Sequence, residues 1–169
     1  MKPDVKTSTL IIGCGNPDRG DDAAGILVVR RLRSMGIPAQ EQSGEALALM
    51  ESWGKEGNQP VILVDAVVTG MPAGTVTIWD ARKAPVVGDY FRCSSHAFGV
   101  ADAIELARIL DLLPHSLLIY GIEGARFEPG SEPSTEVMGA VEKVAECIAL
   151  RVSEPLGAGS LTNSKADRI

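Results

Sequence analysis

Residues 11–25 read IIGCGNPDRGDDAAG, and this stretch predicts the first elements of the fold. The apolar, β-branched residues that run up to Gly13 predict a buried strand. After Asp22, apolar residues recur at helical spacing as far as Met35, which predicts a helix. A strand, a glycine-containing loop and a helix in this order are typical of the opening unit of an α/β fold.

The loop inside this stretch begins like a phosphate-binding loop but ends unlike one. A dinucleotide-binding loop has the pattern G-x-G-x-x-G, whereas here Asp18 stands at the third glycine position, and the G-K-[ST] of a P-loop is missing. Asp18, Asp21 and Asp22 would repel a pyrophosphate, and the dipole of one helix would not offset three negative charges. The three acids therefore favour binding of a cation by this loop over binding of a phosphate, so the sequence does not indicate a nucleotide-binding protein.

Four residues of the loop are assigned to its shape: Gly13, Gly15, Asn16 and Asp21. The glycines permit a tight turn after the strand, and Asn16 tolerates unusual backbone angles. Because Asp is favoured at helix N-caps, we expect one of the adjacent acids Asp21 and Asp22 to cap the helix. The other acid is then available for chemistry.

The rest of the chain alternates strand and helix patterns. The short connection before residues 75–79 predicts that this strand runs antiparallel to its predecessor. We therefore expect one α/β sandwich domain over residues 1–152, built around a mostly parallel sheet with one antiparallel strand. Residues 153–169 are polar and contain Gly and Pro, and we expect a disordered tail there. The further strands are predicted within residues 37–42, 60–68, 75–79 and 116–122, and the further helices within 45–53 and 97–110 and from Ser134 onward.

Composition narrows the class of protein. The net charge of −6 disfavours binding to nucleic acid and to anionic membranes. No apolar run approaches the roughly 20 residues of a membrane-spanning helix, and the N-terminal residues MKPDVKTS lack the apolar core of a signal peptide. Cys14, Cys93 and Cys147 form no CxxC pair, which is typical of a reducing compartment. We expect a cytoplasmic protein, and a monomer.

Three residues are candidates for chemistry because the carboxyl ends of parallel strands meet at one edge of a sheet. They are Asp22, Asp65 after the apolar run VILV, and His96 before an amphipathic helix; His115 lies in a connection remote from that edge. Two carboxylates and an imidazole suit zinc or nickel, and two carboxylates alone suit an aspartic-type acid/base pair. The alternatives are that Asp65 emerges into solvent, that His96 binds a local carbonyl, or that Cys93 and His96 form a nucleophilic pair.

Several segments follow one another in an order and spacing that resemble the hydrogenase maturation proteases. They are IIGCGNPDRGDDAAG, VILVDAVVTGMPAGTV, SSHAFGVADAIELA, IYGIE and FEPGSEPSTEV, and the resemblance covers residues 9–150. It implies a three-layer α/β/α sandwich with a twisted, mostly parallel sheet. It also implies an endopeptidase that removes a short C-terminal peptide from the precursor of a [NiFe]-hydrogenase large subunit and so completes its maturation.

The resemblance further implies the residues that contact metal. Asp22, Asp65 and His96 match the family's three metal-contacting positions, and the nickel is carried by the substrate. These residues then either bind that nickel directly or hold an ion, such as zinc, that positions the hydrolytic water. The alternative function is a nickel-sensing, chaperone-like module that binds the same precursor without cleaving it.

One segment departs from the family pattern. Many relatives carry an Asp-Gly-Gly-Thr-like loop after the second strand, whereas Gln42 and Ser43 stand at the Asp-Gly positions here, and the acids lie at Glu41 and Glu45. The substrate-binding residues are therefore left unassigned. Further along, Glu123 and Glu128 are expected to be solvated surface acids.

Overall fold

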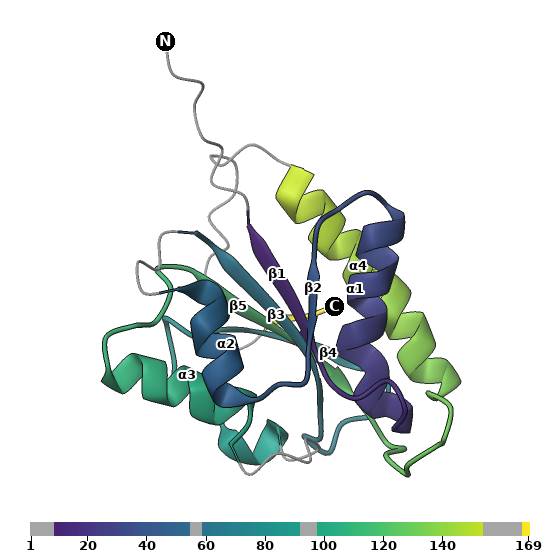
Figure 1. Ribbon diagram of the computed structural model, residues 1–169. Coiled ribbons are helices and arrows are strands. Elements are labelled where there is room, and N and C mark those ends of the chain that lie inside the picture. The colour runs from purple at the N-terminus through teal and green to yellow at the C-terminus, as the bar shows by residue number, and fades with distance from the viewer. Residues whose placement is uncertain (1–8, 55–58, 92–97, 154–166) are drawn as a thin grey trace.

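The computed structural model describes residues 9–54, 59–91, 98–153 and 167–169 (Figure 1). The strands are β1 (Leu10–Cys14), β2 (Gln40–Gln42), β3 (Val61–Val67), β4 (Val76–Asp80), β5 (Leu117–Glu123) and β6 (Asp167–Arg168). The helices are α1 (Ala24–Ser34), α2 (Ala46–Trp53), α3 (Val100–Ile109) and α4 (Thr135–Ser153), with short 3₁₀ turns η1 (Gly20–Ala23) and η2 (Gly88–Phe91).

The strands form one twisted sheet in the order β2-β1-β3-β5-β4-β6. Strands β2, β1, β3 and β5 are parallel, and β4 runs antiparallel to its neighbours. The predicted fold class is therefore confirmed. The predicted direction of β4, antiparallel to its predecessor β3, is confirmed as well, although β4 lies beside β5 in the sheet.

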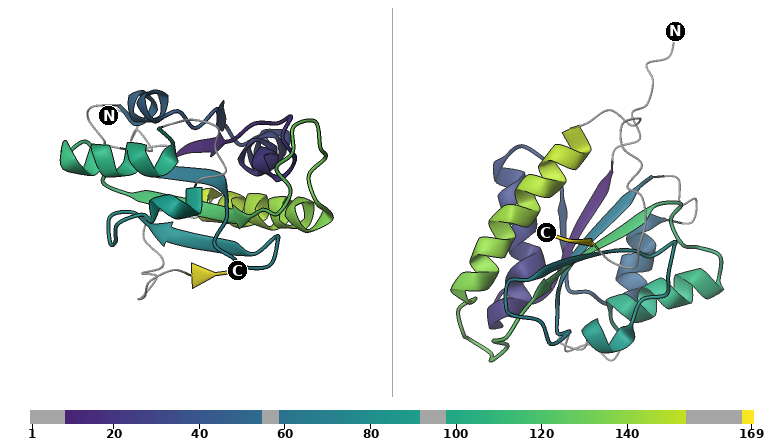
Figure 2. Two further views of the ribbon diagram at one scale, coloured as in Figure 1. Left: turned by 90° about the horizontal axis from the view of Figure 1, so that it is seen from below. Right: turned by 180° about the vertical axis from the view of Figure 1, so that it is seen from behind.

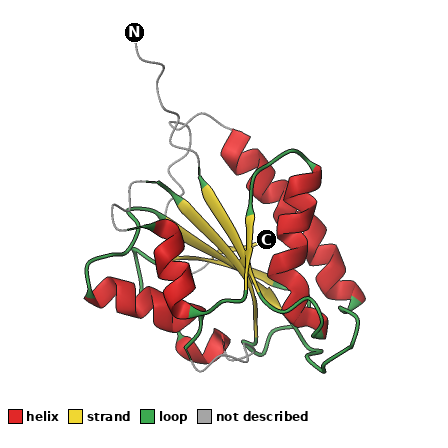
Figure 3. Cartoon of the chain, in the orientation of Figure 1, coloured by secondary structure: helices red, strands yellow, loops and turns green. Residues whose placement is uncertain are grey.

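Helices cover both faces of the sheet, which gives three layers. Helices α1 and α4 lie on one side and α2 and α3 on the other (Figures 1 and 3). Strand β3 is buried along its whole length and alternates between the two cores. Its Leu63 packs in the core under α2 and α3, whereas Ile62 and Val64 pack in the core under α1 and α4. This double burial explains why β3 is almost continuously apolar.

Helix α1 lies unusually close to the sheet. A Cβ atom on Gly25 would collide with the carbonyl oxygens of Cys14 and Val64, and one on Gly13 would collide with the carbonyl oxygen of Gly25. Only glycine allows this approach of two backbones. The close packing places the start of α1, and the turn η1 before it, directly against the carboxyl ends of β1 and β3.

The C-terminal end of the chain differs in part from the predicted tail. Helix α4 continues to Ser153, and Asp167 and Arg168 pair with edge strand β4 (Figure 2). An edge strand has free backbone N–H and C=O groups, so it can accept a further strand. Residues 154–166 lie outside the described part of the chain, so the prediction of disorder stays a prediction there. No helix among the described residues is long and apolar enough to cross a membrane.

Candidate active site at the carboxyl edge of the sheet

Asp65 lies inside β3 and not at its end. The strand continues for two residues beyond it, and Asp65 pairs in register with Gly121 of β5. The side chain is 3% exposed, which excludes the alternative that the strand emerges into solvent at this residue. Its Oδ1 atom accepts a hydrogen bond of 2.9 Å from the backbone N–H of Ala66. An acid in the interior of a buried strand is costly unless it has a partner or a task.

The environment of Asp65 favours its protonated form. Burial is the largest cause and the charge of Asp22 is the second, and together they raise the pKa of Asp65 to about 8, although the bond from Ala66 acts in the opposite direction. Asp22 can act on Asp65 in this way because it lies in the 3₁₀ turn η1, which packs against β3. Two neighbouring carboxyl groups can act as an acid/base pair when one is protonated and the other is ionised. They can also hold a cation, which allows both to ionise.

Asp22 lies in η1 and is 3% exposed. Its carbonyl oxygen accepts a hydrogen bond of 3.2 Å from the backbone N–H of Asn16, which closes the loop. The backbone angle φ of Gly15 is +139°, and a Cβ atom there would collide with the Asp22 carbonyl oxygen. Asn16 in turn accepts a 2.9 Å bond at its Oδ1 atom from the N–H of Asp18. The loop geometry thus depends on the residues assigned to shape.

Neither adjacent acid caps the helix that follows. The N-cap positions of η1 and α1 are Arg19 and Ala23, and no side chain caps either of them. The expectation of an N-cap from Asp21 or Asp22 was therefore wrong. The Asp21 carboxylate instead accepts hydrogen bonds from a loop more than 100 residues further along the chain. Such a long-range partner leaves no local pattern in the sequence.

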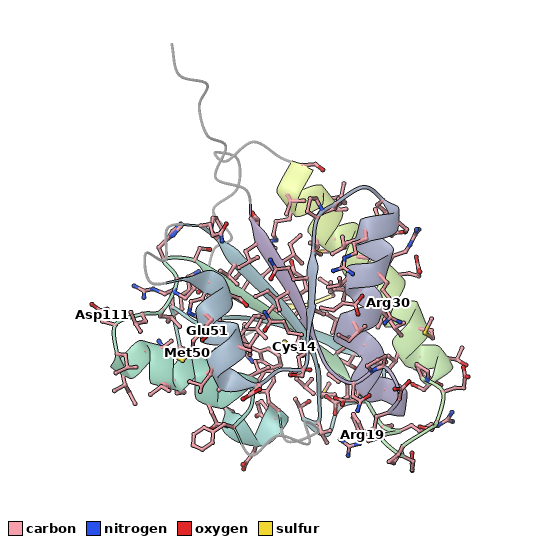
Figure 4. The ribbon with its side chains drawn as sticks, viewed as in Figure 1. Cys14, Arg19, Arg30, Met50, Glu51 and Asp111 are labelled. Carbon is pink, nitrogen blue, oxygen red and sulfur yellow. The ribbon has the colours of Figure 1, made fainter. Side chains whose placement is uncertain are left out.

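Cys14 is a neighbour of the acid pair that sequence analysis did not assign to the site. It ends β1 and lies between the two helical layers (Figure 4). The side chain is 1% exposed. Burial raises the pKa of the Cys14 thiol well above its usual value, and the charges of Asp65 and Asp22 raise it further. The thiol is therefore protonated at neutral pH, which suits packing rather than nucleophilic attack.

His96 and Cys93 lie in residues 92–97, outside the described part of the chain, so their predicted roles are not tested. Among the described residues, no group of three or more His, Cys, Asp and Glu side chains is arranged to hold a metal ion. Of the predicted set Asp22, Asp65 and His96, the described residues include the two carboxylates, and the position of the imidazole stays a prediction. His115 is exposed and precedes β5 at its amino end, remote from the acids as expected.

The segment that departs from the family pattern ends beside the site. Gln42 pairs in register with Cys14, and its amide donates a hydrogen bond to Ser52 Oγ. Glu41 forms ion pairs with Arg30 (3.2 Å) and Arg33 (2.9 Å) at the surface. These ion pairs occupy the carboxylate of Glu41, so it does not replace an acid at position 42.

The expectation for Glu123 was also wrong. The side chain is 3% exposed and accepts hydrogen bonds from Thr69 N–H (2.8 Å), Thr69 Oγ1 (2.8 Å) and Gly70 N–H (3.0 Å). Glu123 thus holds the turn between β3 and β4 and is not a solvated surface acid. Glu128 is exposed, as expected.

Known proteins with similar sequences and structures share this architecture. The family model HycI, described as hydrogenase maturation protease, matches residues 45–150. A protein named as a hydrogenase maturation protease in Methanocaldococcus jannaschii is 31% identical over 153 residues, which span 85% of this chain and 95% of the relative.

Two solved structures extend the comparison. The [NiFe] hydrogenase maturation protease HybD from Thermococcus kodakarensis has a TM-score of 0.65 and 25% identity, over 87% of this chain and 99% of that one. An endopeptidase from Escherichia coli has a TM-score of 0.72 at 23% identity, covers 86% and 93% of the two chains, and shares the fold. The fold and the similarities define an α/β endopeptidase. More specifically, the chain belongs to the hydrogenase maturation protease family.

Proposed function

We propose that this endopeptidase removes a short C-terminal peptide from the nickel-loaded precursor of a [NiFe]-hydrogenase large subunit. Membership of the family supports the class of reaction. The observation that carries the proposal is the buried pair of Asp22 and Asp65, with the pKa of Asp65 raised to about 8 at the carboxyl edge of the sheet. An interior acid with such a shift is typical of a functional site.

The pair suits hydrolysis of a peptide bond. With Asp65 protonated and Asp22 ionised, Asp22 accepts a proton from the attacking water, whose oxygen bonds to the carbonyl carbon. Asp65 gives its proton to the leaving nitrogen as the C–N bond breaks. Each carboxyl group thus changes its protonation state in the cycle, and transfer of the proton from Asp22 back to Asp65, directly or through solvent, restores the starting state. This is aspartic-type chemistry.

The same carboxylates suit recognition of the substrate's nickel. Carboxylate and imidazole ligands bind Ni²⁺ and Zn²⁺, and we assign this role to Asp22, Asp65 and His96. The mutual repulsion of two buried carboxylates favours a cation between them. If Zn²⁺ were resident, it would supply Lewis acidity at this position. We further propose that the enzyme acts as a monomer in the cytoplasm, since its cysteines form no CxxC pair and one large partner must dock on it.

Intact mass spectrometry of the precursor tests this proposal. The hydrogenase large-subunit precursor from the same organism is incubated with the enzyme, once nickel-loaded and once nickel-free. We expect the nickel-loaded sample alone to lose the mass of one C-terminal peptide. Binding of the precursor without any change of mass would instead support the chaperone-like module, and cleavage of both samples would exclude nickel as the signal.

A further inference from the structure

Asp21 is fully buried beside the residue assigned to catalysis, and its carboxylate accepts hydrogen bonds from three backbone N–H groups. Its Oδ2 atom accepts from Ala125 (2.8 Å) and Arg126 (2.9 Å), and its Oδ1 atom accepts from Ser134 (2.6 Å), directly before α4. An ionised carboxylate is the side chain that accepts several such bonds without donating any. Burial alone would raise the pKa of Asp21, but these bonds outweigh it and hold the pKa below its usual value.

Backbone bonds at Asp21 and at the residues before it join the same two segments. The N–H of Asp21 donates to the carbonyl oxygen of Arg126 at 2.6 Å, and the N–H of Gly20 donates to that of Ser131 at 3.0 Å. In the opposite direction, the N–H of Gly130 donates to the carbonyl oxygen of Asp18 at 2.7 Å. The loop between β1 and α1 therefore lies against residues 124–134 through a continuous set of bonds, with the Asp21 carboxylate at its centre.

The position of Asp22 depends on these contacts. Two of its backbone bonds, one to Arg19 and one from Asn16, stay within its loop. Beyond Asp22, the close packing of Gly25 against the sheet fixes α1. Before Asp22, the contacts with residues 124–134 fix the loop. Removal of the Asp21 carboxylate would weaken the second support, because it would remove the three hydrogen bonds that the carboxylate accepts and leave only the backbone bonds.

We propose that Asp21 is a positioning residue for peptide cleavage, which sets the place of Asp22 relative to Asp65 by fastening the first loop to residues 124–134 and to the start of α4. This inference rests on the proposed function for its effect on rate. The inferred position of Asp22 does not depend on the proposed function. Buried groups that orient a catalytic residue typically change activity about 10- to 100-fold when they are removed.

The test compares Asp21→Asn with Glu123→Gln. Both changes replace a buried carboxylate that accepts hydrogen bonds from three donor groups by its amide. Glu123, however, holds the turn at Thr69 and Gly70 and not the loop of Asp22. We expect Asp21→Asn to lower kcat about 10- to 100-fold with little change of KM, and Glu123→Gln to keep kcat at a similar loss of thermal stability. Crystal structures of the wild type and both variants measure the separation of the Asp22 and Asp65 carboxyl groups.

The outcomes separate the two proposals. A displacement of Asp22 of about 1 Å in Asp21→Asn alone supports the inference, since such a shift is enough for a large loss of rate. An unmoved Asp22, or an equal loss of kcat in both variants, would overturn it and leave Asp21 a stability residue. If the wild type cleaves no precursor, the proposed function fails, and the crystal structures still decide the role of Asp21.

A second variant covers the case in which Asp21→Asn does not fold. An ester in place of the amide of Ala125 removes one N–H donor to Asp21 and leaves every side chain unchanged. We expect a smaller shift of Asp22 and a smaller loss of kcat in the same direction. An ester in place of the amide of Thr69, which removes one donor to Glu123, is the matched control. Equal kcat values for these two proteins would count against Asp21 as a positioning residue.

Discussion

At the scale of single residues, Asp65 combines burial with the nearby charge of Asp22, and these raise its pKa to about 8. Asp65 is therefore protonated in the folded protein at neutral pH, whereas an Asp in an unfolded chain is ionised. In the proposed hydrolysis, Asp65 is the acid that protonates the leaving nitrogen. The same difference between the folded and unfolded chain makes the stability depend on pH.

Asp65→Asn tests this difference directly. Between about pH 4 and about pH 8 the folded wild type holds a proton on Asp65 that the unfolded chain lacks, so its free energy of unfolding falls as pH rises. The contribution is complete below about pH 4 and is lost above about pH 8. We expect Asp65→Asn to remove this dependence on pH. At the upper end of the pH range, the free energy of unfolding of the variant should therefore have risen relative to that of the wild type by on the order of a few kcal/mol. Urea unfolding across this range measures it, and parallel curves would contradict a raised pKa.

Asp22→Asn is expected to abolish processing with the fold intact, because the proposed mechanism uses the Asp22 carboxylate to accept a proton from the attacking water. We expect a loss of rate of at least about 100-fold. Asp18→Asn is the matched control, since Asp18 is an exposed acid of the same loop that forms its hydrogen bonds to Asn16 and Gly130 through its backbone. Assays of precursor cleavage and circular dichroism check both variants. Equal activity of Asp22→Asn and Asp18→Asn would exclude Asp22 from the chemistry.

The sequence could predict Asp22 and Asp65 as neighbours because both follow apolar strand patterns that end at one edge of a parallel sheet. It did not predict that Glu123, which follows a similar apolar run, is buried as well. Their roles differ only through partners: Asp65 lies near Asp22, whereas Glu123 binds the turn at Thr69. The sequence also did not predict that Cys14 lies near the acid pair, because a buried thiol has no sequence pattern of its own.

At the scale of elements, the close packing of α1 is what brings the first loop to the site. Gly25→Ala would place a methyl group against the carbonyl oxygens of Cys14 and Val64, so the helix would have to move. We expect a loss of about 2–3 kcal/mol in the free energy of unfolding. In α4, a Cβ atom on Gly139 would meet nothing within 4 Å, so Gly139→Ala should gain about 0.5–1 kcal/mol from helix propensity. Urea unfolding of both variants checks the contrast, and a neutral Gly25→Ala would contradict the close approach.

The direction of β4 could be predicted from the sequence, but its neighbour could not. The short connection after β3 requires a reversal of direction, which the structure shows. Which strand lies beside β4 depends on where β5, some 40 residues later, inserts into the sheet. The order of strands is a long-range property of packing, so local periodicity does not contain it.

At the scale of the whole molecule, the two cores and every strand of the sheet except β6 lie within residues 9–153. Among the described residues, a chain that ends at Ser153 loses the pairing of Asp167 and Arg168 with β4 and the bond from the N–H of Ile169 to the carbonyl oxygen of Val76. We expect it to keep its fold and its cleavage activity, with a loss of at most about 2 kcal/mol, since few backbone hydrogen bonds are removed. Urea unfolding and the cleavage assay measure this. An inactive but folded truncated protein would give the C-terminal residues a part in the reaction.

The most direct test of the account is the intact mass of a nickel-loaded hydrogenase large-subunit precursor after incubation with the wild type and, separately, with Asp65→Asn. If the buried acid pair carries out the cleavage, the wild type removes one short C-terminal peptide, and Asp65→Asn, although folded, leaves the mass unchanged. Cleavage by Asp65→Asn at the wild-type rate would contradict the claim that the buried acid pair carries out the reaction.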